Sequence, residues 1–283
     1  FTVMRFLRLR KEGQEILYIM EDRGIISVPE LIGKQVDIEN VFYHIDSIKA
    51  KLKKGEFSKY DLKDTAYLPA VGRPGKIICI GLNYQAHIQE TKKEIPKYPV
   101  IFSKFNNSLA AHLEKIRIID NGLKIDYEGE LGVMIGTRGF KVREEDALKY
   151  VFGYFIGNDI SSRELQYRTS QYLLGKTLDQ FYPNGPLLVT ADEIPDPQDL
   201  DIRTYVNGEL RQDSNTGNMI FPIRKLISYI SNYIPLEPGD IISTGTPDGV
   251  ISGMPEDRRK WLSSGDDVRI EIENIGELEN NFI

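Results

Sequence analysis

The length, composition and charge of the chain indicate a globular protein without disulfides. Its 283 residues are 41% hydrophobic and 28% charged, enough for one large domain or two modest ones. The single cysteine, Cys79, excludes an intramolecular disulfide framework and a zinc cluster built on cysteines. A net charge of −6 argues against nucleic acid, and residues 77–89, the longest stretch without Asp, Glu, Lys or Arg, are too few to cross a bilayer. We therefore expect a soluble cytoplasmic protein that binds neither nucleic acid nor membrane.

The first 70 residues are predicted to form a small unit. Its predicted elements are strands at 4–9 and 15–20 around a polar turn, a helix at 41–52 and a charged linker at 53–63. We accordingly divide the chain into a small N-terminal domain at 1–70 and a larger domain at 71–283.

The larger domain is predicted to be rich in strands. Predicted strands lie at 76–81, 98–104, 125–135, 150–156, 187–190, 240–244 and 267–274, with a hairpin at 201–212 and helices at 222–233 and 255–262. Asn207 and Gly208 suit a type I′ turn in the hairpin, because both central residues of that turn need positive φ. Strands and helices do not alternate regularly, as they would in a Rossmann fold or TIM barrel. The chain therefore reads as a mixed α/β, strand-rich fold.

Acidic residues recur at every second position of the strand predicted at 125–135. Asp126, Glu128 and Glu130 would face the same side of that strand. Two carboxylates ~4 Å apart repel by roughly 4 kcal/mol at an effective dielectric constant near 20. A hard cation such as Mg²⁺ or Mn²⁺, with Ca²⁺ as an alternative, removes this repulsion by taking the oxygens as ligands. The other interpretation is a solvated edge strand with Glu128 and Glu130 on its wet face.

Asp159 begins a loop directly after the aromatic strand at 150–156. It is a candidate third carboxylate ligand, with Arg163 and Gln166 on the turn that follows. Taken alone, helix N-capping by Asp159 explains this position better.

Histidine is rare in the chain, and one of the three histidines has an acidic neighbour at helical spacing. His87 and Glu90 would share one face of a helical turn. A carboxylate beside an imidazole raises its basicity, which suits a general base for water. A surface His–Glu pair is the alternative. His44 reads as a structural residue of the predicted N-terminal helix, and the role of His112 is left undecided.

Two glycine-containing segments complete the set of candidates. Lys176, between Gly175 and Thr177, is suited to neutralise an enolate or a carboxylate, although without the rest of a P-loop it is not a phosphate motif. The segment 239–250 runs from a strand into a loop whose hydroxyl and backbone N–H groups suit a carboxylate. A plain tight turn is the alternative for that loop.

In their order along the chain, these segments resemble the fumarylacetoacetate hydrolase family, in particular its acylpyruvate hydrolase-like and 2-hydroxyhepta-2,4-diene-1,7-dioate isomerase-like members. The matching motifs are Gly-Leu-Asn-Tyr-x-x-His-x-x-Glu, Asp-Tyr-Glu-x-Glu-Leu, Asn-Asp-x-x-x-Arg-x-x-Gln, Gly-Lys-x-x-Asp and Gly-Asp-Ile-Ile-x-Thr-Gly-Thr-Pro-x-Gly-Val. They extend from about Val71 to Phe282. The resemblance implies a β-sandwich roll behind a variable small N-terminal domain, a catalytic role for residues 71–283, and a homodimer.

The resemblance also implies roles for individual residues. Glu128, Glu130 and Asp159 would hold Mg²⁺ or Mn²⁺, whereas Asp126 belongs to the motif without being implied as a ligand. His87 and Glu90 would form the acid–base pair on a segment that closes over the substrate. The residues implied around the 2-oxo acid substrate are Lys176, Arg163, Gln166, Thr246, Asn83 and Tyr84.

The function expected from this set is metal-dependent hydrolysis of the C–C bond of an acylpyruvate-type 2,4-dioxo acid. The metal and Lys176 would stabilise an enolate, and His87 would activate the attacking water. The alternatives are oxaloacetate decarboxylation, isomerisation or dehydration of a related acid, and a non-catalytic protein that senses a dicarboxylate. The sequence departs from residues common in the family at Gln85, at the Ala110-Ala111-His112 stretch and at Tyr182. The identity of the substrate group farthest from the metal is therefore not predicted.

Overall fold

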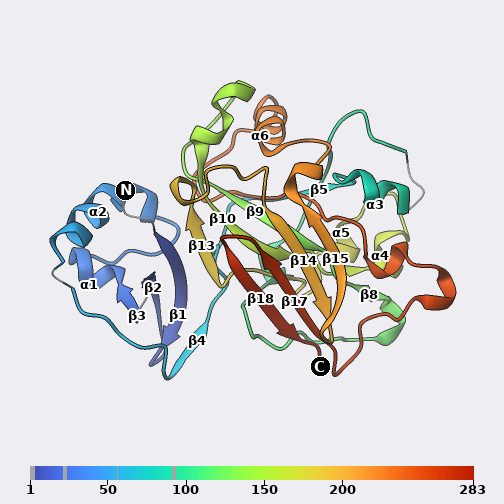
Figure 1. Ribbon diagram of the computed structural model, residues 1–283, viewed down its shortest axis with the longest axis horizontal. Helices are drawn as coiled ribbons and strands as arrows, with labels where there is room; N and C mark the ends of the chain where they lie inside the picture. Colours follow the sequence, from blue (N-terminus) through green and yellow to red (C-terminus); the bar gives the residue numbers. More distant parts are fainter. Residues whose placement is uncertain (1–3, 22–23, 56, 91–93) are drawn as a thin grey trace.

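A ten-stranded sheet runs through the molecule (Figure 1). The computed structural model describes residues 4–21, 24–55, 57–90 and 94–283. The sheet has the order β3-β2-β1-β13-β10-β9-β16-β5-β6, with β4 paired to β1. Its strands are β1 (Arg5–Lys11), β2 (Gln14–Glu21), β3 (Gly24–Ser27), β4 (Thr65–Tyr67), β5 (Ile77–Gly81), β6 (Val100–Ser103), β9 (Gly129–Ile135), β10 (Val151–Asn158), β13 (Leu187–Thr190) and β16 (Ile241–Ser243).

A second, four-stranded antiparallel sheet covers part of the first. It has the order β15-β14-β17-β18, and its strands are β14 (Asp201–Val206), β15 (Glu209–Asn215), β17 (Asp267–Ile272) and β18 (Gly276–Asn281). β14 packs against β9, while β17 and β18 pack against β10, so that the orange and red strands lie over the green ones in Figure 1. The two sheets enclose a hydrophobic core that contains Leu131, Ile202 and Ile270. This arrangement is the predicted strand-rich sandwich roll.

Short elements connect and flank the sheets. Two-stranded ladders join β8 (Ile125–Asp126) to β11 (Ser161–Ser162) and β7 (Leu109–Ala110) to β12 (Tyr182–Pro183). The α-helices are α1 (Val28–Ile32), α2 (Ile45–Lys54), α3 (Gln85–Glu90), α4 (Arg163–Gln166), α5 (Leu173–Lys176) and α6 (Ile223–Ser231). The 3-10 turns are η1 (Val41–His44), η2 (Asn106–Ser108), η3 (Asn121–Leu123), η4 (Glu144–Tyr150), η5 (Ala191–Glu193), η6 (Thr216–Asn218), η7 (Ile251–Gly253) and η8 (Glu256–Arg258). None of the described helices combines the length and apolar composition that a bilayer crossing requires.

The N-terminal residues extend the large sheet. β1 pairs antiparallel with β13, which places Phe6 opposite Leu188. Both side chains belong to a second hydrophobic cluster, which also contains Ile48 from α2 and Phe155 from β10. The division of the chain at residue 70 stays a prediction, and the pairing of β1 with β13 connects the two parts through backbone hydrogen bonds.

Each range predicted as a strand contains a strand, but one of these ranges is broken. β8 ends at Asp126 and β9 begins at Gly129, because β8 pairs with β11 whereas β9 pairs with β10. Tyr127 and Glu128 lie between the two strands. The expectation that Asp126, Glu128 and Glu130 line one face of a single strand was therefore wrong, although Glu128 and Glu130 still come together.

The helix predictions were less accurate at their ends. The predicted helix at 41–52 begins as the 3-10 turn η1 before α2 continues it. The helix predicted at 255–262 was wrong, because the structure has only the 3-10 turn η8 there. Residues 255–260 are exposed and offer no apolar stripe that a longer helix could bury.

Candidate active site

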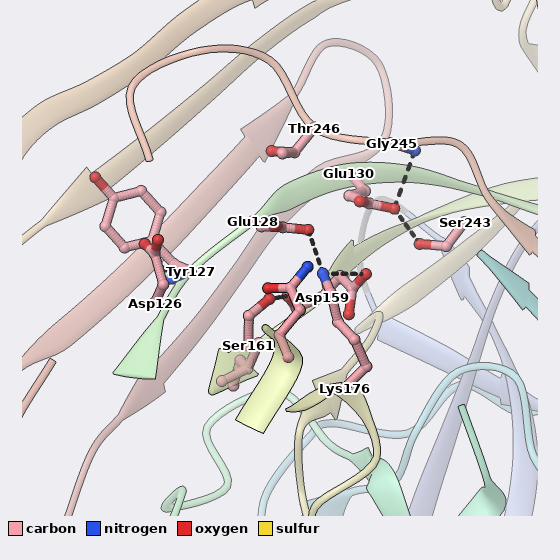
Figure 2. A network of polar contacts seen from close by, with 12 residues as sticks. Asp126, Tyr127, Glu128, Glu130, Asp159, Ser161, Lys176, Ser243, Gly245 and Thr246 are labelled. Atoms are coloured by element: carbon pink, nitrogen blue, oxygen red, sulfur yellow. Dashed lines mark hydrogen bonds and ion pairs between the residues drawn. The ribbon is translucent and has the colours of Figure 1, made fainter. Parts of the chain in front are cut away.

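Three buried carboxylates, on or next to the neighbouring strands β9 and β10, lie close together (Figure 2). One carboxylate oxygen of each of Glu128, Glu130 and Asp159 lies within 4.8 Å of the others. β9 and β10 run antiparallel with Asn158 opposite Gly129, so that Asp159 falls beside Glu128. The Asp159 N–H donates to the Glu128 carbonyl at 2.9 Å, which fixes this alignment.

This burial removes two of the simpler interpretations. Glu128 and Glu130 are both buried, so the solvated edge strand was wrong. Asp159 does not cap α4 either, because Ser162 is the N-cap and its hydroxyl accepts from the Leu165 N–H at 3.3 Å.

Lys176 joins two of the carboxylates. Its Nζ lies 2.7 Å from Glu128 Oε2 and 2.9 Å from Asp159 Oδ2. Figure 2 shows the ammonium group between the two acids. Burial alone would lower the pKa of Lys176, but the charges of Asp159 and Glu128 outweigh it and raise the pKa above its usual value. Lys176 therefore remains a cation in this cluster.

Lys104, which sequence reasoning missed, holds the other oxygen of Asp159. Its Nζ lies 2.7 Å from Asp159 Oδ1 and donates to the carbonyls of Ile160 at 3.1 Å and Phe181 at 2.9 Å. It also donates to the Lys176 carbonyl. The available signal was a lysine that directly follows the apolar strand β6, where a buried charge needs a partner.

The acidic groups of the cluster respond differently to burial. Burial raises the pKa of Glu128, but Lys176 and Arg163 reverse this effect and lower it to about 2. Burial and the charges of Asp159 and Glu128 raise the pKa of Glu130 well above its usual value. Glu130 accepts hydrogen bonds from the Ser243 hydroxyl and, at 3.1 Å, from the Gly245 N–H.

These three carboxylates fit a hard divalent cation. The donor set is entirely oxygen, and the repulsion that raises the pKa of Glu130 is the kind that a bound cation relieves. Together with Asp126, the buried carboxylates outnumber the buried cations Arg163, Lys104 and Lys176 by one. A divalent ion would reverse the sign of this formal charge and leave the site attractive to an anion.

Tyr182, one of the departures from the family pattern, supports this cluster. Its hydroxyl donates to Ser243 Oγ at 2.9 Å, and Ser243 in turn donates to Glu130. The tyrosine thus orients a hydrogen bond to a cluster carboxylate from outside the cavity.

Arg163 and Gln166 lie at the two ends of α4, beside the cluster. Arg163 Nη1 lies 2.7 Å from Glu128 Oε1 and donates to Gln166 Oε1 at 2.8 Å. Its Nε donates to Asp126 Oδ2 at 2.9 Å. Protein carboxylates thus hold the guanidinium group in a fixed orientation at the cavity wall.

His87 and Glu90 come to the site on α3. His87 is buried, and its Nδ1 lies 3.6 Å from Glu90 Oε2. Both carboxylate oxygens of Glu90 accept from the Gly249 N–H at 3.2 Å. The predicted proximity of this pair is therefore present in the structure.

Two cavities adjoin the cluster. The inner cavity has a volume of about 30 Å³ and is lined by Ile80, Gly81, Leu82, His87, Phe102, Glu128, Arg163, Gln166, Tyr167, Tyr172, Lys176 and Thr246. The outer cavity, of about 840 Å³, shares Arg163 and Tyr167 with it and includes Glu90 in its wall. Arg163 and Tyr167 thus separate the inner cavity at the carboxylates from a much larger space.

The remaining predicted residues differ in how they face this site. Thr246 lines the inner cavity, and its hydroxyl donates to the Gly129 carbonyl at 2.9 Å. Asn83 is fully buried, and its amide bonds the backbone of Phe221 and Thr244. Tyr84 is also fully buried, and among the described residues its hydroxyl has no hydrogen-bond partner. Their substrate-binding roles stay predictions.

His112 lies in the wall of another cavity. Its Nδ1 accepts from the Glu279 N–H at 3.1 Å, and its ring packs edge-to-face against Tyr67. Burial lowers the pKa of His112, which agrees with the neutral ring that an accepting Nδ1 requires.

The strand-rich roll and its cluster of buried carboxylates and lysines are features of an enzyme active site. Comparison with known proteins identifies the family. The model of the fumarylacetoacetate (FAA) hydrolase C-terminal family matches residues 76–283. The chain belongs to the fumarylacetoacetate hydrolase family, and it is an enzyme.

Individual relatives differ in the activity that their names give. A mitochondrial oxaloacetate tautomerase of Rattus norvegicus is 44% identical over 77% of this chain and 69% of its own length. A putative HpcE protein from Mycobacterium smegmatis is 32% identical, with a TM-score of 0.90 over 99% of both chains. A maleylpyruvate hydrolase from Sphingobium sp. SYK-6, solved with manganese(II) and pyruvate, is 27% identical, with a TM-score of 0.83 over 99% of both chains.

Proposed function

We propose that this enzyme interconverts the keto and enol forms of a 2-oxo dicarboxylic acid of the oxaloacetate type. The observation that carries the proposal is the convergence of Glu128, Glu130 and Asp159 on one point beside Lys176, at the wall of a cavity that also contains His87. The similarity to proteins named oxaloacetate tautomerase supports this reaction over the hydrolysis expected from the sequence alone.

Glu128, Glu130 and Asp159 are the residues that would hold the divalent cation, for which we propose Mg²⁺ or Mn²⁺. When bound, such an ion supplies Lewis-acid stabilisation to the oxygen that becomes negatively charged in the enolate. The manganese(II) and pyruvate in the maleylpyruvate hydrolase relative support an ion of this kind.

The chain's own residues account for charge and proton movement. Lys176 presents a fixed positive charge to the developing enolate oxygen, and it needs no reorientation because Glu128 and Asp159 already hold it. Arg163 and Gln166 orient the carboxylate of the substrate. In the keto-to-enol direction His87 takes the proton from C3 at Nε2 and delivers it to the 2-oxo oxygen, and ketonisation reverses both transfers; Glu90 near Nδ1 stabilises the protonated ring.

C–C bond hydrolysis of an acylpyruvate-type 2,4-dioxo acid is the second candidate. The outer cavity of about 840 Å³ favours it, because a four-carbon acid leaves most of this space unused. In that reaction His87, supported by Glu90, activates a water molecule toward the distal carbonyl. Decarboxylation of oxaloacetate would break the C3–C4 bond, release CO2 and leave the pyruvate enolate beside Lys176, without that water.

Parallel assays with matched variants separate these reactions. Enol decay and pyruvate formation are followed with oxaloacetate, and substrate loss with acetylpyruvate, each with Mg²⁺, Mn²⁺ or excess chelator after subtraction of the uncatalysed rate. We expect metal-dependent tautomerisation that falls by about 100-fold or more in Glu128→Gln, because the weakened site would hold less of the ion that stabilises the developing charge. The control is Glu145→Gln, whose side chain is 65% exposed. Enol decay that neither chelator nor Glu128→Gln slows would contradict the proposal, and faster loss of acetylpyruvate than of enol would favour hydrolysis.

A further inference from the structure

Asp126 and Tyr127, which have no part in the proposed chemistry, hold the loop formed by residues 249–253. Asp126 is fully buried, and its carboxylate accepts from the N–H groups of Ile251 and Ser252, each at 2.9 Å. The hydroxyl of the buried Tyr127 donates to the Gly249 carbonyl at 2.6 Å. Figure 2 shows both side chains at a distance from the three cluster carboxylates.

The loop 249–253 in turn contacts the carboxylate of Glu90 and fixes its position. The Gly249 N–H donates to both carboxylate oxygens of Glu90. At Gly253 the fit is close, because an added Cβ would lie 2.1 Å from the Glu90 carboxyl carbon. The position of Glu90, and through it that of the neighbouring His87, therefore depends on where the loop is held.

We infer that Asp126 and Tyr127 are positioning residues that clamp the loop 249–253 so that it seats Glu90 beside His87. This inference rests on the proposed function of His87 and Glu90 in proton transfer.

Asp126 is suited to positioning because its carboxylate is fully engaged. Besides the two loop N–H groups, it accepts from the Tyr127 N–H at 3.0 Å and from Arg163 Nε at 2.9 Å. It therefore joins Arg163, which contacts the cluster at Glu128, to the loop that seats the acid–base pair. Misplacement of a reacting group by about 1 Å can cost on the order of 100-fold in rate. The gain in rate from correct positioning therefore offsets the cost of burying the Asp126 carboxylate.

Two substitutions loosen the contact between the loop and Glu90 without changing a residue that lines the inner cavity. Tyr127→Phe removes only the hydroxyl that binds Gly249, and Gly253→Ala pushes on the flexible end of Glu90. We expect kcat to fall by about 10-fold or more for Gly253→Ala and by less for Tyr127→Phe, with KM and the affinity for Mn²⁺ changed less than about twofold. Tyr154→Phe, which removes a buried phenol hydroxyl from β10, is the control and should keep kcat.

A double-mutant cycle tests whether the loop acts through Glu90. In the Glu90→Gln background, Gly253→Ala and Tyr127→Phe should cost less in kcat than they do in the wild-type background. Full additivity, or losses of the same size in Tyr154→Phe, would overturn the inference and leave Tyr127 as a residue of general stability.

Amide hydrogen exchange tests the clamp without any assay of turnover. We expect faster exchange at residues 85–90 in Tyr127→Phe and Gly253→Ala, with unchanged exchange in β9 and in Tyr154→Phe. If 2-oxo acids are not turned over but this exchange pattern appears, the proposed function fails while the clamp stands. Unchanged exchange at 85–90 in both variants would refute the clamp.

Discussion

At the scale of single residues, Lys104 shows what a motif can leave out. Its ammonium is buried, and burial lowers its pKa while Asp159 opposes that shift. The residues next to Lys104 in the sequence do not indicate which carboxylate pairs with it, because Asp159 lies far along the chain. Glu128 and Glu130, by contrast, were recognisable as candidates from their spacing, and Asp159 joined them through the order of the family motifs.

We predict that Lys104→Met destabilises the protein by about 3–5 kcal/mol, because it leaves the buried Asp159 with one cation fewer and three carbonyls without their donor. The free energy of unfolding from urea titration measures this. Lys149→Met, at an exposed position, is the control and should stay within about 0.5 kcal/mol of wild type. A loss for Lys104→Met as small as that of the control would show that the site tolerates an unneutralised Asp159.

At the scale of elements, the β9–β10 pair builds the cluster. Its register places Glu130 opposite Gly157 and carries Asp159 to the side of Glu128. Within the pair, Gly132 lies opposite Phe155, and an added Cβ would lie 2.3 Å from the Phe155 ring. A glycine at this position therefore lets the aromatic ring cross the neighbouring strand.

We predict that Gly132→Ala costs about 1–3 kcal/mol through overpacking and also weakens Mn²⁺ binding, because the strands that carry Glu130 and Asp159 must move apart. Chemical denaturation and calorimetric titration measure the two effects. Phe155→Leu added to Gly132→Ala makes room and should recover part of the metal affinity. Should Gly132→Ala destabilise the fold with full metal affinity, the site would be independent of this contact.

At the scale of the whole molecule, the N-terminal strands complete the large sheet. Phe6 on β1 is fully buried and stacks on Phe152 of β10, with ring centroids 5.9 Å apart. The single tryptophan, Trp261, lies in the other part of the chain and borders the outer cavity. Its fluorescence therefore reports on the catalytic part when a change is made in the N-terminal part.

We predict that Phe6→Ala destabilises the whole molecule by about 3–5 kcal/mol, so that the unfolding transitions seen by Trp261 fluorescence and by far-UV circular dichroism shift together. Tyr43→Ala, whose native side chain is 74% exposed, is the control. An unshifted Trp261 transition in Phe6→Ala would mean that residues 1–70 unfold as a separate domain. The homodimer implied by family resemblance stays a prediction, which the mass from light scattering tests.

The sequence by itself determined the strand-rich class and the ordered family motifs that contain the three carboxylates, because these depend on residue type and on spacing within each motif. The tertiary structure decided three other features: the break between β8 and β9, the partners of Lys104, and the support that Tyr182 gives Glu130 through Ser243. Each of them joins segments far apart in the chain. Strand register and the need of buried charges for partners select such contacts only when the whole core assembles.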